Sequence, residues 1–501
     1  MSNTHPVRIR FRSAIGLLAA LILVAAPAAA APASIDPAAA AAWGFDRSDL
    51  TPHPGVRFGV LPNGMRYVLM RHAGAGDAKT GLSVRLHLDA GSSAEAPGQA
   101  GYMHLIEHMI FHGSANLPKG ALLTLLPHAG LRRWSDFGAT TSYDETVYAL
   151  ELGKADARAR TAALMVMREV CSHLRFGRAA VRGAKADVRS EIRARDAVAD
   201  RIATAQNEFF VPGTPIARGP VAGTDGSVAR AGGSALSKLY ARTYVPARTT
   251  LVMVGDFDPD AAEAEIGARF ADWLPAAAAL DPPPPVVTPG TGLHTRLFVD
   301  RAAPTVVTIA AVAPLGGADA GAGRDAAFLQ NLGSEMLARR LTAGPGTRVL
   351  RATAAVYDHF STARLALIEM NPRDRDWRTA VRHGAIELDR ALKVGFTQAE
   401  LDEQLRVSRR APVADDAPRT ATSMADAIVD AVGRDIVFTA PSDRSGFEAY
   451  LARVRLVDVN AAFRTAWAGG GRFVFVSHDR AIPGGEAAIA EAWTRPGPAS
   501  L

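Results

Sequence analysis

The segment H-L-I-E-H at residues 104–108 places two histidines and one glutamate within five positions. If it is helical, residues three and four apart lie on one face, about one turn apart. His104 and His108 can then direct an imidazole nitrogen each toward a single metal ion. Glu107 lies beside them, where its carboxylate can take a proton from water. The spacing therefore predicts a hydrolytic metal site, and the alternative is a helix with unrelated histidines and an unrelated glutamate.

The composition is that of an ordinary globular protein with more than one domain. The chain has 501 residues, of which 48% are hydrophobic and 21% are charged, and one core rarely extends over that length. The net charge is +6, and removal of residues 1–31, which carry three arginines and no acidic residue, lowers it to +3. A charge this small, without a basic run, argues against nucleic acid as a partner. The single cysteine, Cys171, rules out an internal disulfide framework.

The N-terminus has the features of an export signal. Arginines at positions 8, 10 and 12 precede an apolar run, residues 14–25, and small residues up to Ala31 offer cleavage sites. The apolar run is short for a membrane span. We expect residues 1–31 to be removed on export to the periplasm or the exterior, and the alternative is an uncleaved membrane anchor. After removal of the signal, the sequence predicts no membrane span.

A proline-rich stretch around residues 282–285 divides the remaining chain. Apolar periodicity before it predicts strands within 59–70, 81–91 and 249–256, and helices at about 99–112, 156–177, 180–208 and 235–243. After it, a strand, a long helix and a closing strand at 472–479 repeat this order. The predicted fold is α+β, with two similar α/β-sandwich halves, each a mixed or antiparallel sheet with helices on one face. We predict a signal peptide at residues 1–31, a flexible lead-in at 32–52 and a catalytic domain at 53–274. A linker at 275–295 and a non-catalytic domain at 296–490 follow.

Four ordered segments between residues 56 and 256 resemble the pitrilysin-type zinc peptidases, or inverzincins, and most closely their exported bacterial members of two-domain length. The segments are G-V-L-P-N-G-M-R-Y-V-L from residue 59, G-Q-A-G-Y-M-H-L-I-E-H-M-I-F-H-G-S from residue 98, F-G-A-T-T-S-Y-D-E-T-V-Y-A-L-E-L from residue 137, and D-V-R-S-E-I-R from residue 187 with the later P-V-A-G-T. The resemblance implies a zinc-dependent endopeptidase that cleaves peptides or unfolded protein segments. The alternative is a non-catalytic relative that binds peptides or another peptidase chain.

The resemblance also implies a third metal ligand. Glu191 matches the family's glutamate on a later helix, 83 residues after His108, so that His104, His108 and Glu191 would hold one Zn²⁺ per chain. The alternative is a surface glutamate paired with Arg189 or Arg193.

The implied mechanism follows from these residue types. The metal would lower the pKa of a water molecule, and Glu107 would act as the general base and later protonate the leaving amine. His112 cannot share the ion with His104, because eight helical residues span about 12 Å.

In the family, a strand beside the metal pairs with an extended substrate, and residues 137–148 match that strand. Gly138, Ala139 and Thr140 are therefore the predicted substrate-binding residues, with Gly138 at a position where the family commonly has Asn. Arg351 and Tyr357 lie near the place where the family's second half offers Arg and Tyr to the zinc, but their spacing differs. Because longer relatives carry four halves, a homodimer or a heterodimer with a related chain is also possible.

Overall fold

The computed structural model describes residues 41–45, 48–73, 81–128, 136–195, 197–274, 287–288, 290–316, 321–343, 347–410, 420–439 and 444–494. The predicted signal peptide and most of the predicted linker lie outside these residues. Among the helices that are described, none has the length and apolar character needed to cross a membrane.

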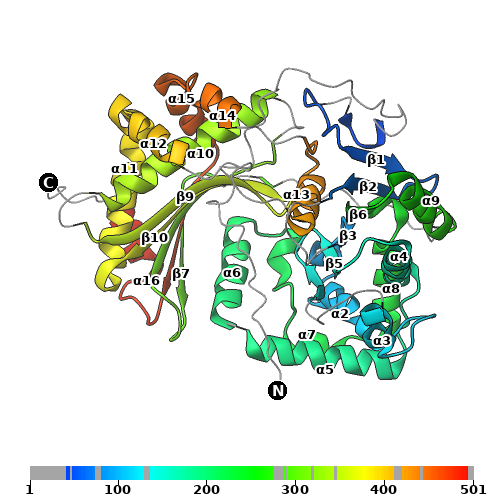
Figure 1. Cartoon of the computed structure of the whole chain (residues 1–501). Coiled ribbons are helices and arrows are strands. Elements are labelled where there is room, and N and C mark those ends of the chain that lie inside the picture. Colours follow the sequence, from blue (N-terminus) through cyan, green and yellow to red (C-terminus); the bar gives the residue numbers. More distant parts are fainter. Residues whose placement is uncertain are drawn as a thin grey trace.

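The first half is built on a six-stranded mixed sheet (Figure 1). Its strands are β1 Val56–Val60, β2 Arg66–Arg71, β3 Leu82–Leu88, β4 Phe137–Thr141, β5 Thr146–Leu152 and β6 Thr249–Gly255. The order across the sheet is β1-β2-β6-β3-β5-β4, with β2 and β6 parallel and the other neighbours antiparallel. β4 is therefore an edge strand, and one side of its backbone is left without a strand partner in the described sheet.

The second half repeats this topology in five strands. They are β7 Leu293–Val299, β8 Val306–Ala313, β9 Val349–His359, β10 Ala363–Pro372 and β11 Arg472–His478. The order β7-β11-β8-β10-β9 has its only parallel pair at β7 and β11. This matches β2-β6-β3-β5-β4 strand for strand, so the predicted α+β fold of two similar halves is confirmed. β7 begins at residue 293, inside the stretch assigned to the linker.

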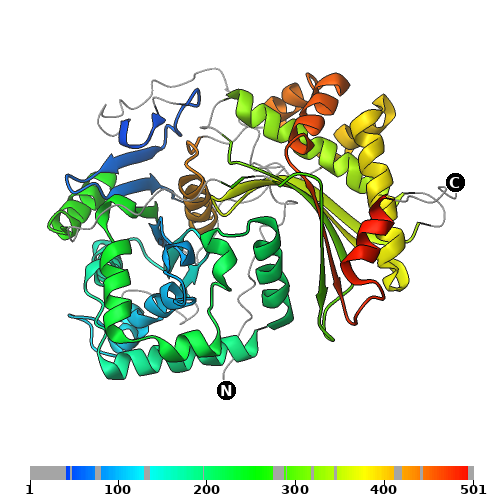
Figure 2. The ribbon, with the colours of Figure 1, turned by 180° about the vertical axis from the view of Figure 1, so that it is seen from behind.

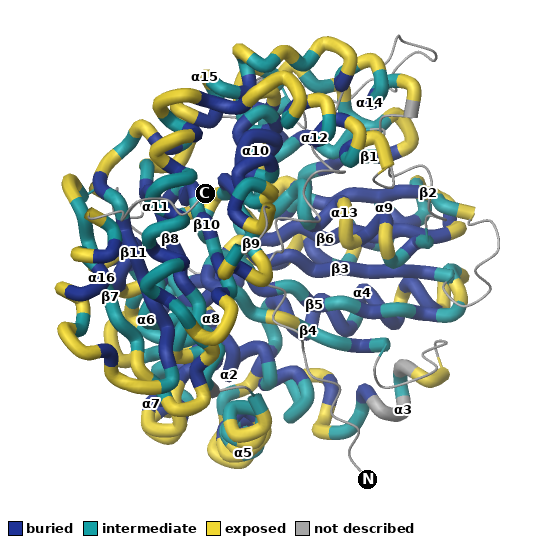
Figure 3. Tube along the Cα trace, turned by 90° about the vertical axis from the view of Figure 1, so that its left-hand side faces the viewer, coloured by how far each residue is buried: buried dark blue, intermediate teal, exposed yellow. Residues whose placement is uncertain are grey.

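Most helices of each half cover one face of its own sheet and bury its apolar side chains. The helices of the first half are α2 Tyr102–His108, α3 Ala121–His128, α4 Ala157–Ser172, α5 Arg178–Ala194, α6 Ala197–Phe210, α7 Asp225–Arg230, α8 Gly233–Thr243 and α9 Pro259–Phe270. Those of the second half are α10 Gly321–Thr342, α11 Trp377–Lys393, α12 Gln398–Arg410, α13 Ala421–Gly433, α14 Arg444–Leu451, α15 Leu456–Trp467 and α16 Gly485–Thr494. The exceptions are α6 and α13. Figure 3 shows β3 and β6 of the first sheet buried along their length, whereas β4 at the edge is mostly intermediate.

The other face of each sheet is covered by a helix from the opposite half, an arrangement that the sequence did not predict. α13 lies on the first sheet, where Met424 and Ile428 pack against Val68 and Val252 in one apolar cluster. α6 lies on the second sheet, where Phe209 packs against the aromatic side chains of β11. Figures 1 and 2 show α6 and α13 between the two halves. The halves are thus joined by two exchanged helices.

The predicted helix at 180–208 is two helices in the structure. α5 ends at Ala194, Arg195 has extended backbone angles, and α6 begins at Ala197. The apolar pattern continues through the break because α5 packs on the first core and α6 on the second sheet. A helix straight through residue 195 would not reach both.

Two further predictions need correction. Residues 137–148 are not one strand but the end of a hairpin, in which β4 and β5 flank a turn at residues 142–145. The lead-in at 32–52 is not flexible and exposed throughout, because the indole of Trp43 is buried against Phe58 and donates a hydrogen bond to the Gly59 carbonyl.

Candidate metal centre

α2 carries the H-L-I-E-H segment and begins at a tightly packed glycine. Gly101 has φ +89, and a Cβ there would lie 2.7 Å from the carbonyl oxygen of Ala222, in the P-V-A-G-T segment. The buried Glu95 carboxylate accepts hydrogen bonds from the backbone N–H groups of Gly101 and Met103. These are among the N–H groups that a helix start leaves without intrahelical partners. Burial raises the pKa of Glu95 to about 8, although these N–H groups oppose the shift.

The three predicted ligands converge on one point. Nε2 of His104 and Nε2 of His108 are 3.3 Å apart. One carboxylate oxygen of Glu191, on α5, lies 3.3 Å from the His104 nitrogen and 3.4 Å from the His108 nitrogen. α5 packs against α2 and so brings a residue 83 positions later in the chain to the histidine pair.

This triangle fits a zinc ion. Three ligands on a tetrahedral Zn²⁺, with bonds of about 2.1 Å, stand about 3.4 Å from one another, which is the separation found between His104, His108 and Glu191. Two imidazoles and a carboxylate are also a donor set that zinc hydrolases use. Nδ1 of His104 is buried and has no hydrogen-bond partner among the described residues, so the polar contacts of this ring are made through Nε2.

Glu191 is held on its far side by Arg195, one helical turn further along. The Arg195 guanidinium donates two hydrogen bonds to the second carboxylate oxygen of Glu191, the one from Nε at 3.1 Å. Burial alone would raise the pKa of Glu191, but hydrogen bonds from His104 and His108 and the charge of Arg195 hold it far below its usual range. Glu191 therefore lies against the two histidines and Arg195 and is not paired with Arg189, which binds Asp225 instead.

The predicted base, Glu107, lies next to the histidines. One ligand-type atom from each of His104, Glu107 and His108 lies within 4.8 Å of the other two. The Glu107 carboxylate accepts a hydrogen bond of 2.6 Å from the hydroxyl of Thr141, the last residue of β4. Glu107 therefore lies beside the histidine pair, with one carboxylate oxygen held by Thr141.

His112 is not part of the three-ligand site. It lies in the short 3₁₀ helix Met109–His112, and its Nε2 is 2.7 Å from Asp187 of α5. A Cβ at Gly183 would collide with the imidazole of His112, so the glycine makes room for this contact. His112 and Asp187 together join this 3₁₀ helix to α5, one turn away from Glu191.

The predicted substrate strand lies beside the centre. Gly138, Ala139 and Thr140 belong to β4, the edge strand, and α2 packs against it. Gly138 has open space around its Cβ position. Arg351 and Tyr357 are on β9, and Tyr357 packs in the apolar cluster that surrounds α6. The substrate-binding roles of Gly138, Ala139 and Thr140 stay predictions, and the sequence assigns no role to Arg351 or Tyr357.

Sequence reasoning missed Arg195, Thr141 and Glu95. The i, i+4 spacing of Glu191 and Arg195 was a usable signal, but it is common on helix surfaces. Neither the contact of Thr141 with Glu107 nor that of Glu95 with α2 has a local sequence pattern.

Comparison with known proteins agrees with this geometry. Residues 75–208 match the family described as Insulinase (Peptidase family M16), and the segment contains both histidines, Glu107 and Glu191. Through this segment the chain is similar to peptidase family M16. The resemblance predicted from the four segments is thereby confirmed.

Two proteins named probable zinc protease PqqL are similar to the first half. The one from Haemophilus influenzae is 28% identical over 206 residues, which cover 41% of this chain and 22% of the relative. The one from Escherichia coli is 30% identical over 201 residues, which cover 40% of this chain and 21% of the relative. The matched segment thus spans only about a fifth of these relatives.

Solved structures extend the likeness to both halves. The first half of the periplasmic protease PqqL from Escherichia coli superposes with a TM-score of 0.74 at 20% identity, over 90% of this chain and 99% of that one. A structure described as a peptidase M16 inactive domain from Pseudomonas fluorescens gives a TM-score of 0.65 at 17% identity, over 85% of this chain and 98% of that one. At these identities the comparison shows the fold, which is shared by active and inactive proteins.

Proposed function

We propose that this protein is a zinc-dependent endopeptidase with His104, His108 and Glu191 as metal ligands and Glu107 as general base. The observation that carries the proposal is the convergence of three ligand atoms at 3.3–3.4 Å with Glu107 adjacent. The names of the PqqL relatives, which are zinc proteases, support it.

The residues divide the chemistry among them. A zinc ion held there would supply Lewis acidity, lowering the pKa of a water molecule and polarising the scissile carbonyl. Glu107 takes the proton of the attacking water and returns it to the leaving amine. The hydroxyl of Thr141 and the buried position of Glu107 on α2 keep that carboxylate in place.

The substrate in this proposal is an extended peptide or an unfolded protein segment. β4 offers the free side of its backbone at Gly138, Ala139 and Thr140, so a peptide in β conformation can add to the sheet by main-chain hydrogen bonds. Such pairing recognises backbone shape more than side chains. Association with a second, related chain and export to the periplasm stay parts of the proposal, and PqqL of Escherichia coli is described as periplasmic.

The test compares two variants by metal content and by cleavage of an internally quenched peptide of mixed sequence. Glu107→Gln is expected to keep stoichiometric zinc and to lose cleavage. Glu191→Ala is expected to lose zinc, since two ligands remain. Unchanged cleavage by Glu107→Gln would refute the role of the base.

The second candidate is a non-catalytic family member that binds peptides or a partner peptidase chain. The structural likeness to a protein described as an inactive M16 domain supports this second candidate. It predicts peptide binding without turnover in the zinc-loaded wild-type protein, which the same peptide assay detects. The intact ligand triangle favours the enzyme.

A further inference from the structure

The hydrogen bond between Thr141 and Glu107 connects the general base to the substrate strand. Side chains on a strand alternate between its faces, so Thr141 lies on the same face of β4 as Phe137 and Ala139, which both pack in the core shared with α2. Its hydroxyl reaches one oxygen of the buried Glu107 carboxylate at 2.6 Å. A hydroxyl donor fixes the rotation of a carboxylate without supplying a charge.

Thr141 is itself held by the turn that follows it. The backbone N–H groups of Ser92 and Ser93 donate to the carbonyls of Ser142 and Tyr143. A Cβ at Gly91 would lie 2.4 Å from the Ser142 carbonyl oxygen, so the glycine allows this close approach. The first half thus fixes one side of the turn.

The second half fixes the other side through the tip of the β9–β10 hairpin. The ring of Phe360 packs edge-on against Tyr143 with centroids 4.7 Å apart. The hydroxyl of Ser361 donates a 3.1 Å hydrogen bond to the Asp144 carboxylate. Phe360 and Ser361 both have positive φ, at 47 and 50, a conformation that costs energy for residues with side chains and is kept only where the surroundings hold it.

α13 adds a third contact to the same turn. Glu145 pairs with the buried His87 at 3.1 Å, beneath the end of the helix. A Cβ at Gly433, the last residue of α13, would lie 2.7 Å from the Glu145 carboxylate. Two separate elements of the non-catalytic half therefore contact the four residues that follow Thr141.

We propose that Thr141 is a positioning residue for Glu107, and that the hairpin tip Phe360–Ser361 of the second half holds it in position. The second half then contributes to hydrolysis without touching the metal ligands. This inference rests on the proposed function, in which Glu107 is the general base.

The first test replaces Thr141 in the full-length, zinc-loaded protein. Thr141→Val removes the hydroxyl at nearly constant volume, and we expect kcat for the quenched peptide to fall roughly 10- to 100-fold, with KM and zinc content unchanged. Thr141→Ser keeps the hydroxyl and is expected to restore kcat. A Thr141→Val enzyme with wild-type kcat overturns the proposal, and so does a Thr141→Ser enzyme as slow as Thr141→Val.

The second test asks whether the hairpin tip acts through Thr141. The double substitution Phe360→Ala with Ser361→Ala is expected to lower kcat, and to lower it much less in a Thr141→Val background, because both changes act on one contact. Leu350→Ser is the matched control and should keep wild-type kcat, because Leu350 is exposed at the end of β9 that lies away from the tip. If the tip substitutions lower kcat by the same factor in the wild-type and Thr141→Val backgrounds, the tip does not act through Thr141 and its proposed role is overturned.

A crystal structure separates failure of this inference from failure of the proposed function. Thr141→Val is expected to show the Glu107 carboxylate rotated from its wild-type position while the three ligands keep theirs. An unmoved carboxylate overturns the inference even if no peptide is cleaved. If Glu107→Gln still cleaves peptide at the wild-type rate while the Thr141→Val structure shows a rotated Glu107 carboxylate, the proposed function is rejected. The positioning contact is then still established.

Discussion

At the scale of single residues, the hydrogen bonds from Arg195 to Glu191 would strengthen the proposed zinc site. Partners of metal ligands typically contribute 10- to 100-fold to affinity. We therefore predict that Arg195→Met weakens zinc binding by roughly that factor, as measured by competition with a chromogenic chelator. Arg189→Met is the matched control, since Arg189 lies on α5 two residues before Glu191 but binds Asp225, and it should keep wild-type affinity. Equal losses of zinc affinity in both variants would show that the positive charge near α5, and not the contact of Arg195 with Glu191, sets the affinity.

How far the sequence predicts these residues depends on the distance between them in the chain. His104, Glu107 and His108 follow from spacing within one helical turn. Glu191 required resemblance to a family, because nothing local connects it to α2. Thr141 reaches Glu107 across 34 positions, through the packing of a helix on a strand, and no pattern in either segment announces that contact.

At the scale of elements, α2 depends on a carboxylate outside the helix. Glu95 accepts from two backbone N–H groups at the helix start, and leaving such buried donors without a partner costs about 1–3 kcal/mol. Glu95→Ala is expected to destabilise the protein by about that amount in urea unfolding, and Glu95→Gln by less, since an amide oxygen still accepts. Gln99→Ala is the control, because Gln99 caps only the exposed Ala96 N–H; a loss as large as that of Glu95→Ala would contradict the argument.

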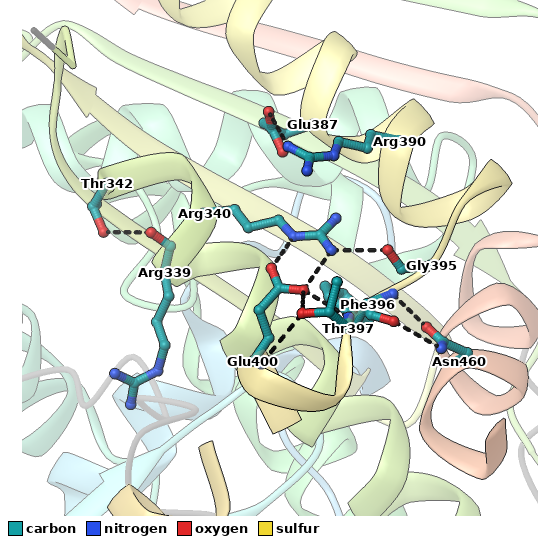
Figure 4. A network of polar contacts seen from close by, with 10 residues as sticks. All are labelled: Arg339, Arg340, Thr342, Glu387, Arg390, Gly395, Phe396, Thr397, Glu400 and Asn460. Atoms are coloured by element: carbon teal, nitrogen blue, oxygen red, sulfur yellow. Dashed lines mark hydrogen bonds and ion pairs between the residues drawn. The ribbon is translucent and has the colours of Figure 1, made fainter. Parts of the chain in front are cut away.

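The junction of α11 and α12 with α10 is held by an ion pair, shown in Figure 4. Arg340 donates to both oxygens of Glu400 and to the carbonyl of Gly395, and Thr397 donates to Glu400 from its backbone and its hydroxyl. Burial acts to raise the pKa of Glu400, but the hydrogen bonds from Arg340 and Thr397 outweigh it and lower the pKa to about 2.

This shift predicts an acid-dependent loss of stability. A carboxylate with a depressed pKa contributes stability above its unfolded value, near 4.5, and loses it as the pH falls toward 2. The difference in urea midpoint between wild type and Glu400→Gln should therefore be largest above pH 5 and shrink toward pH 2. Asp402→Asn, on the same helix, is the control and should follow the wild-type profile. A constant difference at all pH values would contradict the assignment.

Element boundaries were predictable where a turn or glycine marks them, as at Gly113, which ends the 3₁₀ helix that follows α2. The break at Arg195 was not, because α5 and α6 share one continuous apolar pattern and only the presence of two separate cores divides them.

At the scale of the whole molecule, the exchange of α6 and α13 makes each half depend on the other. Expressed alone, residues 41–274 would expose the face of the first sheet that carries Val68 and Val252, together with the ring of Phe209. We predict that this fragment aggregates by itself, and that co-expression with residues 287–494 gives a soluble complex by size-exclusion chromatography. A soluble, monomeric first half with the thermal stability of the full chain would contradict this dependence.

The sequence predicted two similar halves because their strands and helices recur in order. It could not predict the exchange, since an amphipathic helix such as α13 shows that it has an apolar face but not which sheet that face covers. The same ambiguity hid the interdomain ion pair between Asp426 of α13 and Arg85 of β3.

The exchange also sets an order of events during synthesis. The strands around the metal-binding helix leave the ribosome first, yet the helix that seals their second face, residues 421–433, is translated near the end. Contacts this far apart in the chain form slowly, so the nascent first half must wait with an open apolar surface. We therefore expect chaperones that bind nascent chains to shield this surface until residues 421–433 have been synthesised.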